Sequence, residues 1–165
     1  MIRQAVIDTG PLFSALVVNH VQQRPTKGNR DRLLGCVNES VQHPDAHVRF
    51  LSVLGSISRK LTTSHVLGEI NGLVNVKLKL HEPELSRFWN GCIELLTLWE
   101  LDERLIRFLD FAGASAPGIA RLGIVDTGLI RLAQEHGCVL ITEDGPLFRL
   151  AGEQGVDCRS LKSLL

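Results

Sequence analysis

The sequence predicts a single α/β domain in which a parallel β-sheet lies between layers of helices. Short apolar runs alternate with longer stretches of helical periodicity along the chain, and this alternation is typical of a parallel sheet that is covered on both faces. The chain has 165 residues, of which 44% are hydrophobic and 22% charged, as expected for one globular domain with its own core. We therefore expect a three-layer α/β/α sandwich with roughly five parallel strands, formed by residues 1–165.

Short segments rich in aliphatic and β-branched residues are the predicted strands. The first ends at the turn sequence Asp8-Thr9-Gly10-Pro11, so a helix is expected to begin directly after it. The predicted strands are residues 3–7, 60–63, 96–101, 139–142 and 156–159.

The segments between these strands have apolar residues at helical spacing. Ser64 is the expected N-cap of one helix, and Gly137 is expected to end another. The predicted helices are residues 11–19, 30–39, 48–54, 65–74, 82–95, 102–111, 124–137 and 146–152. The polar stretch at about residues 20–45 is interpreted as a helical and loop elaboration of the domain rather than a linker.

Charge and apolar patterning exclude several classes of protein. The formal net charge is +0, which gives no support to a basic nucleic-acid coat. No apolar run has the roughly 18 residues that a membrane span needs, and the N-terminal region lacks the pattern of a secretory signal because Asp8 lies inside its apolar stretch. We expect a cytoplasmic protein without a membrane segment.

Cysteine and histidine spacing does not indicate a zinc site. The four cysteines form no C-x-x-C pair, and Cys92 and Cys138 are predicted to be buried free thiols. The six histidines show no metal-ligand spacing and are expected on the surface or in loops. The sequence also lacks the glycine-rich phosphate loops of nucleotide-binding folds and the G-x-S-x-G nucleophile elbow.

Four acidic residues occupy positions that a parallel sheet brings to one edge. Asp8 ends the first strand, Asp144 follows the fourth, and Asp126 and Glu69 lie on or beside the apolar stripes of helices. Each alone has a structural explanation as a turn, cap or solvated residue. Together they indicate a site, because ligands of such sheets bind outside the carboxyl ends of the strands.

A short sequence echo supports this interpretation. Residues 6–10 (VIDTG) recur as residues 124–128 (IVDTG), and residues 10–13 (GPLF) recur as residues 145–148. We interpret the echo as repeated use of one local device, an acid at a helix entrance, rather than as a duplicated domain.

Converging carboxylates would repel one another strongly at neutral pH. A hard divalent cation relieves that repulsion, and oxygen-rich sites suit Mg²⁺ or Mn²⁺. Such ions activate water and stabilise the charge that develops on a phosphate during hydrolysis.

Four motifs in order resemble those of PIN-domain nucleases, the family that includes the VapC-like ribonucleases. They are residues 6–12 (VIDTGPL), 62–70 (TTSHVLGEI), 123–130 (GIVDTGLI) and 140–144 (LITED), and the resemblance covers nearly the whole chain. It implies a five-stranded parallel sheet and a divalent-metal-dependent endoribonuclease that hydrolyses RNA phosphodiester bonds with metal-activated water. Many such proteins are toxins paired with an antitoxin protein, and many form homodimers.

The resemblance also implies roles for individual residues. Asp8, Glu69 and Asp126 would be the main metal ligands, Asp144 the fourth acid, and Thr142 a supporting hydroxyl at the catalytic site. Glu143 competes with Asp144 for the fourth role because it lies one residue away.

Substrate contacts are expected from local groups, because the whole chain has no excess positive charge. Thr9, Arg121 and Arg149 are the candidate substrate-binding residues near the acids. Further basic residues that could contact an RNA backbone are Arg24, Lys27, Arg30, Arg32 and Arg131. The sequence contains no tyrosine and no evident aromatic platform for stacking bases.

Two other hypotheses remain open at this point. One is a non-catalytic PIN-like module that binds RNA or a protein partner. The other is a metal-dependent enzyme that acts on DNA or a small phosphoester. Dependence on a divalent metal separates the enzymes from the binding module, and substrate preference separates the two enzymes.

Overall fold

The computed structural model describes residues 2–23, 27–107, 111 and 117–165. Within these residues a five-stranded sheet has the order β3-β2-β1-β4-β5, and all neighbouring strands are parallel. The strands are β1 (Gln4–Ile7), β2 (Arg59–Thr63), β3 (Asp102–Arg104), β4 (Val139–Ile141) and β5 (Cys158–Arg159). The expected parallel α/β architecture is therefore confirmed.

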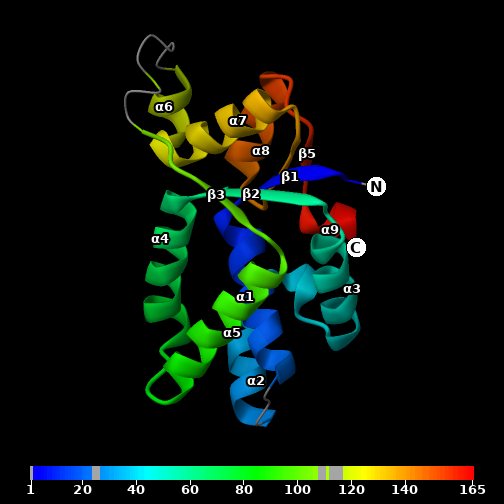
Figure 1. Ribbon diagram of the computed structural model, residues 1–165, viewed down its shortest axis with the longest axis vertical. Helices are drawn as coiled ribbons and strands as arrows, with labels where there is room; N and C mark the ends of the chain where they lie inside the picture. Colours follow the sequence, from blue (N-terminus) through cyan, green and yellow to red (C-terminus); the bar gives the residue numbers. More distant parts are fainter. Residues whose placement is uncertain (1, 24–26, 108–110, 112–116) are drawn as a thin grey trace.

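Helices cover both faces of this sheet (Figure 1), with α6 and α7 on one face and α1, α4 and α5 on the other. The helices are α1 (Thr9–Gln23), α2 (Lys27–Leu34), α3 (Pro44–Gly55), α4 (Ser64–Leu73), α5 (Glu84–Leu98), α6 (Pro117–Leu122), α7 (Ile124–His136), α8 (Gly145–Glu153) and α9 (Leu161–Leu164). A 3₁₀ turn η1 (Glu39–Val41) precedes α3, and a π-helical turn η2 (Val74–Leu78) extends α4. No helix in the described ranges is long and apolar enough to cross a membrane.

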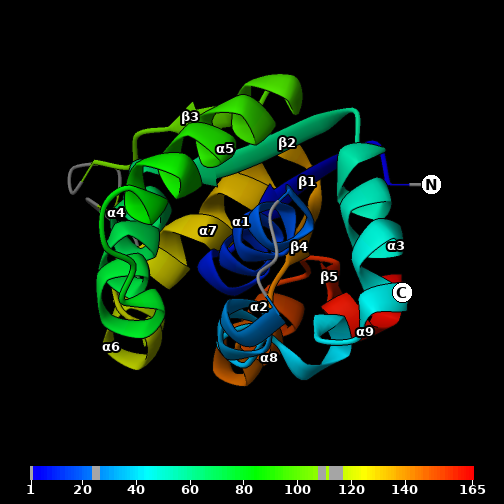
Figure 2. The same cartoon turned by 90° about the horizontal axis from the view of Figure 1, so that it is seen from below.

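Helix α1 is buried on nearly all sides, as its position among neighbouring helices explains. Its residues 11–18 are all buried, and it packs against α2, α3, α4 and α5. The view along the other axis places α1 in the middle of this group (Figure 2). A helix enclosed in this way is apolar around its whole circumference, so α1 and the buried strand β1 form the centre of the core.

The third strand differs from the prediction. Residues 96–101 were predicted as a strand, but α5 continues to Leu98, and the strand begins only at Asp102. Leu95 and Trp99 are one helical turn apart and both buried, which explains the apolar residues there as a helical stripe. The predicted helix over residues 102–111 is also wrong for its first six residues, since Asp102–Arg104 is β3 and residues 105–107 form no regular element. Residues 108–110 of that prediction lie outside the described residues.

Smaller differences concern helix ends and buried polar residues. The N-cap of α4 is Thr63 rather than Ser64, because the Thr63 side chain accepts from the Val66 N–H at 3.3 Å. His20 and His47 are buried rather than superficial. Cys92 and Cys138 are free thiols as predicted, but only Cys92 is buried, whereas Cys138 is partly exposed. The helix predicted over residues 30–39 is instead α2 followed by η1.

Candidate active site

Asp8 stands at the carboxyl end of the central strand and is held there by hydrogen bonds. Its backbone N–H donates to Ile141 O at 3.0 Å, extending the ladder between β1 and β4. Its carboxylate Oδ1 accepts from Thr9 N at 2.6 Å, and Oδ2 accepts from Thr142 Oγ1 at 2.6 Å. With only 7% of its surface exposed, Asp8 is the innermost of the four acids.

Thr142 connects Asp8 to the loop that contains Asp144. The Thr142 hydroxyl is fully buried and accepts from Asp144 N at 3.0 Å while it donates to Asp8. Asp144 is the N-cap of α8, and its Oδ1 accepts from Leu147 N at 2.7 Å. These bonds place the ends of β1 and β4 side by side and fix the start of α8.

Glu69 is tied to the same edge from the other side. It lies on α4, directly after β2, and its Oε2 accepts from Thr9 Oγ1 at 2.5 Å. Thr9, predicted as a substrate-binding residue, therefore bridges two acids through its backbone and its hydroxyl. A continuous chain of hydrogen bonds runs from Glu69 through Thr9, Asp8 and Thr142 to Asp144.

Asp126 lies in the first turn of α7. The negative charges of the other three acids act on its carboxyl group. Burial raises the pKa of its carboxyl to about 6, and the charges of Asp8, Asp144 and Glu69 contribute in the same direction. The pKa of Asp8 is also raised, first by burial and then by Glu69 and Asp144, although its bonds to Thr142 and Thr9 oppose the shift. The structure thus brings Glu69, Asp126 and Asp144 within electrostatic reach of Asp8.

The oxygen ligands of the four acids and Thr142 are of the type that a hard cation prefers, but their geometry does not surround a common metal position. Carboxylate and hydroxyl oxygens are the ligands that Mg²⁺ and Mn²⁺ prefer. In the described part of the chain, however, no group of three or more His, Cys, Asp or Glu side chains is placed so that it could hold a metal ion. Asp8, Glu69 and Asp144 each have a carboxylate oxygen bonded to a protein donor, so these side chains would have to turn toward a shared ion.

Glu143, the competitor for the fourth acidic role, is engaged elsewhere. Its Oε2 accepts from Asn38 Nδ2 at 2.8 Å, and its Oε1 accepts from the backbone N–H of Leu161. Asp144 is the more exposed of the two residues and raises the pKa of both Asp8 and Asp126. Asp144 is therefore the fourth acid of the cluster. The Asn38 contact was missed because the two partners are 105 positions apart.

The two predicted arginines differ in their surroundings. Arg149 is exposed on α8, and its Nη1 lies 3.7 Å from the position that a Cβ on Gly145 would occupy, next to Asp144. Arg121 instead pairs with Glu153 at 3.2 Å, which is at the far end of α8 from Asp144. Of the two, Arg149 is the one that the structure places beside the start of α8, next to Asp144.

The other basic residues show less relation to the acids. Arg131 pairs with Glu135 at 2.8 Å within α7. Arg32 donates to Leu78 O and so ties α2 to η2. Arg30 lies near His47, whose pKa is lowered by burial and further by the charge of Arg30. Arg24 lies outside the described residues, and the side chain of Lys27 does too.

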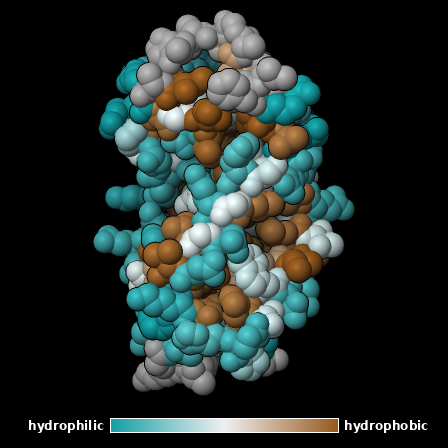
Figure 3. Space-filling model, turned by 90° about the vertical axis from the view of Figure 1, so that its left-hand side faces the viewer, coloured by the Kyte–Doolittle hydropathy of each residue, from teal (hydrophilic) through white to brown (hydrophobic). Residues whose placement is uncertain are grey.

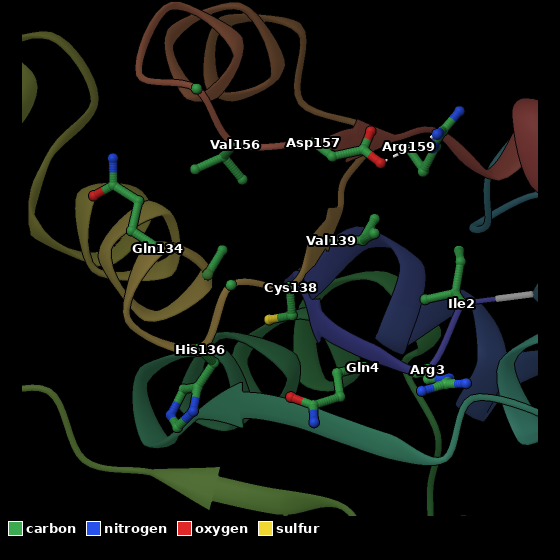
Figure 4. A pocket seen from close by; sticks show the side chains of 13 residues that line it. Ile2, Arg3, Gln4, Gln134, His136, Cys138, Val139, Val156, Asp157 and Arg159 are labelled. Carbon is green, nitrogen blue, oxygen red and sulfur yellow. Dashed lines mark hydrogen bonds and ion pairs between the residues drawn. The ribbon is translucent and has the colours of Figure 1, made fainter.

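A large hollow lies at the opposite edge of the sheet. It has a volume of about 830 Å³ and is lined at the amino ends of β1 and β4 by Gln4, Val139 and their neighbours. The close view shows Arg159 turned to Asp157 within it (Figure 4), and the two side chains are 3.1 Å apart. None of the four acids lines this hollow. The hollow is therefore separate from the candidate active site.

The side of the molecule on which α4 and α6 lie has a mixed surface (Figure 3). Apolar side chains emerge in patches among hydrophilic ones on that face. Exposed large apolar residues include Ile93 and Leu98 on α5 and Leu105 after β3.

Comparisons with known proteins leave the family open. No protein-family model matches the chain, and no curated protein is similar to it. A solved structure described as a domain of a functionally unknown protein from Methanocaldococcus jannaschii DSM 2661 is similar with a TM-score of 0.49 and 12% sequence identity. That similarity covers 96% of this chain and 90% of the other, and it supports no argument about function.

Proposed function

We propose that this protein is a divalent-metal-dependent endoribonuclease of the PIN type. The observation that carries the proposal is the chain of hydrogen bonds that joins Glu69, Asp8 and Asp144 through Thr9 and Thr142 at the carboxyl ends of β1 and β4. The raised pKa of Asp126, caused by burial and by the charges of these three acids, supports it. Four acids gathered at one sheet edge destabilise the apo protein, and such strain is common at catalytic sites. The four PIN-like motifs contain these same acids.

Mg²⁺ or Mn²⁺ bound by these carboxylates would supply the Lewis acid that activates water and stabilises charge on the phosphate. Asp8, Glu69, Asp126 and Asp144 are the residues that would hold it. Thr142 orients Asp8 through Oδ2, and Asp126 must lose its proton before its carboxylate can bind a cation.

The RNA backbone would lie along the exposed rim of this cluster. Glu69 and Asp144 are exposed while Asp8 is buried, so the cluster opens outward from Asp8. The Arg149 guanidinium, which lies beside Gly145, would neutralise a phosphate next to Asp144. The net charge of +0 implies that phosphate contacts are few and that affinity depends on the cation.

A second candidate function is a non-catalytic PIN-like module that binds RNA or a protein partner. The observation that favours it is that no three candidate ligands in the described residues are arranged to hold a metal ion. An antitoxin protein and a second copy of this chain are partners that the PIN resemblance suggests. Metal-dependent cleavage separates the two functions.

The test is cleavage of a panel of mixed single-stranded RNAs with Mn²⁺ or Mg²⁺. The wild type is compared with Asp8→Asn and Asp126→Asn, and Asp157→Asn at the opposite edge is the matched control. We expect cleavage by the wild type and the control, and a loss of at least roughly 100-fold in the two site variants. Folded wild-type protein that cleaves no RNA with either metal would reject the nuclease and favour the binding module.

A further inference from the structure

The side chain of Asn38, in the elaborated segment before α3, contacts the loop between β4 and α8 that contains Asp144. Asn38 Nδ2 donates to Glu143 Oε2 at 2.8 Å across 105 positions of sequence. The other oxygen of Glu143 accepts from Leu161 N at the start of α9. Glu143 thus joins three segments that are distant in the sequence.

The orientation of the Asn38 amide is fixed by its own local contacts. Asn38 is the N-cap of η1, and its Oδ1 accepts from Ser40 N at 2.9 Å and from Ser40 Oγ at 2.7 Å. Because the oxygen is occupied on that side, the amide nitrogen faces Glu143. The contact is therefore a directed, charge-assisted hydrogen bond.

Glu143 lies between the two residues that link β4 to the acid cluster. Thr142 on one side donates to Asp8, and Asp144 on the other donates its N–H to Thr142 and caps α8. The Glu143 Cβ also lies 3.8 Å from the position of a Cβ on Gly10, so this loop packs against the start of α1. A shift of Glu143 would move both neighbours relative to Asp8.

We infer that Asn38 is a positioning residue, which acts through Glu143 to hold the loop of Thr142 and Asp144 in register with Asp8. The elaborated segment is then part of the support of the candidate site. The importance of that register for cleavage rests on the proposed nuclease function, whereas the link between Asn38 and the loop does not.

Exchanging the amide of Asn38 and the carboxylate of Glu143 tests the hydrogen bond between them. Asn38→Asp places two carboxylates against each other, and Glu143→Gln places two amides there. The double variant Asn38→Asp/Glu143→Gln restores a donor and an acceptor. In it the new aspartate still accepts from Ser40, and the new glutamine still accepts from Leu161 N. Asn90→Asp on α5, an exposed site, is the matched control for the added charge.

The readout is amide hydrogen exchange of Asp144 and Leu147, measured without metal or RNA. We expect about tenfold faster exchange of these two amides in Asn38→Asp, because the loop that positions their acceptors loosens. The double variant should return within about twofold of the wild type, and Asn90→Asp should not change.

Three results would overturn the inference. They are unchanged exchange in Asn38→Asp, a failure of the double variant to restore it, and an equal rise in the amides of α5, which would mean general destabilisation. Mn²⁺ affinity measured on the same variants should follow the same order. A wild type that binds no Mn²⁺ would reject the proposed function and leave the exchange result intact.

Discussion

The Asp-Thr-Gly sequence occurs twice in this chain, at residues 8–10 and 126–128, and the two copies have different structures. Asp8 follows a buried strand, and its carboxylate accepts from Thr9 N and Thr142 Oγ1. Asp126 lies inside the first turn of α7. The following threonines differ too, since Thr9 Oγ1 donates to Glu69 while Thr127 Oγ1 donates to Gly123 O of its own helix, at 2.7 Å.

The comparison teaches that hydrogen-bond donors, more than burial, set these two acids apart. Asp8 is the more buried, yet its two donors oppose the rise in its pKa. For Asp126 every cause acts in the same direction, and its pKa reaches about 6. One tripeptide thus provides an anchored acid at a strand end and a strained acid at a helix start.

The largest effect on stability is expected from the threonine that serves Asp8. Thr142→Val removes the donor to Asp8 and the acceptor of Asp144 N, and should destabilise the fold by about 2 kcal/mol. Thr127→Val removes only a bond within its own helix, and should cost no more than about 0.5 kcal/mol. Urea denaturation measures both, and equal losses would contradict the distinction.

A smaller effect of opposite sign is expected at Asp126. Its folded pKa is raised from 3.8 to about 6, so the stability that its protonation provides is present below the unfolded pKa and is lost as pH rises through about 6. Asp126→Asn should therefore stabilise the protein at neutral pH, by about 1 kcal/mol after allowing for screening of this partly exposed group.

The matching variant Asp8→Asn should bring no such gain, because its amide nitrogen would face Thr9 N or the Thr142 hydroxyl. Thermal unfolding at about pH 5 and about pH 7.5 compares the two variants with the wild type. A gain at Asp126 that persists unchanged at the lower pH would refute the electrostatic explanation.

A difference of similar size to that at Asp126 is expected between the two glycines. A Cβ on Gly10 would make an ordinary contact of 3.8 Å with Glu143 Cβ, whereas one on Gly128 would lie 2.6 Å from Ile106 Cδ1. Both positions are helical, so alanine gains helix propensity at each, but Ile106 must turn aside for the second. Gly10→Ala should be more stable than Gly128→Ala by about 1 kcal/mol in the same denaturation assay.

Much of this architecture can be predicted from the sequence, because strand and helix periods differ. The rule that parallel strands place ligands at their carboxyl ends predicts the sites of Asp8 and Asp144. The strand β3 could not be predicted in this way. It is an edge strand paired only with β2, and its three residues are polar, with Asp102 bonded to Arg59 and Arg104, so no apolar pattern marks it.

The side-chain pairing within the site was also beyond the sequence. No local pattern indicates that Thr9 donates to Glu69, 60 positions away, or that Asn38 engages Glu143. Such bonds depend on how α4 and η1 pack beside the ends of β1 and β4. They engage Glu143 with Asn38 and Leu161 N, whereas Asp144 bonds to Thr142 beside Asp8, a distinction that the sequence left open.

Calorimetric titration with Mn²⁺ tests the central claim, that the four acids form a metal site, most directly. The wild type should bind Mn²⁺ at about pH 7.5 and roughly tenfold more weakly at about pH 5, where about a tenth of Asp126 would be ionised. Asp126→Asn should lose most of this binding, and Asp157→Asn should retain it. Absence of binding in the folded wild type, or equal binding by all three proteins, would contradict the claim.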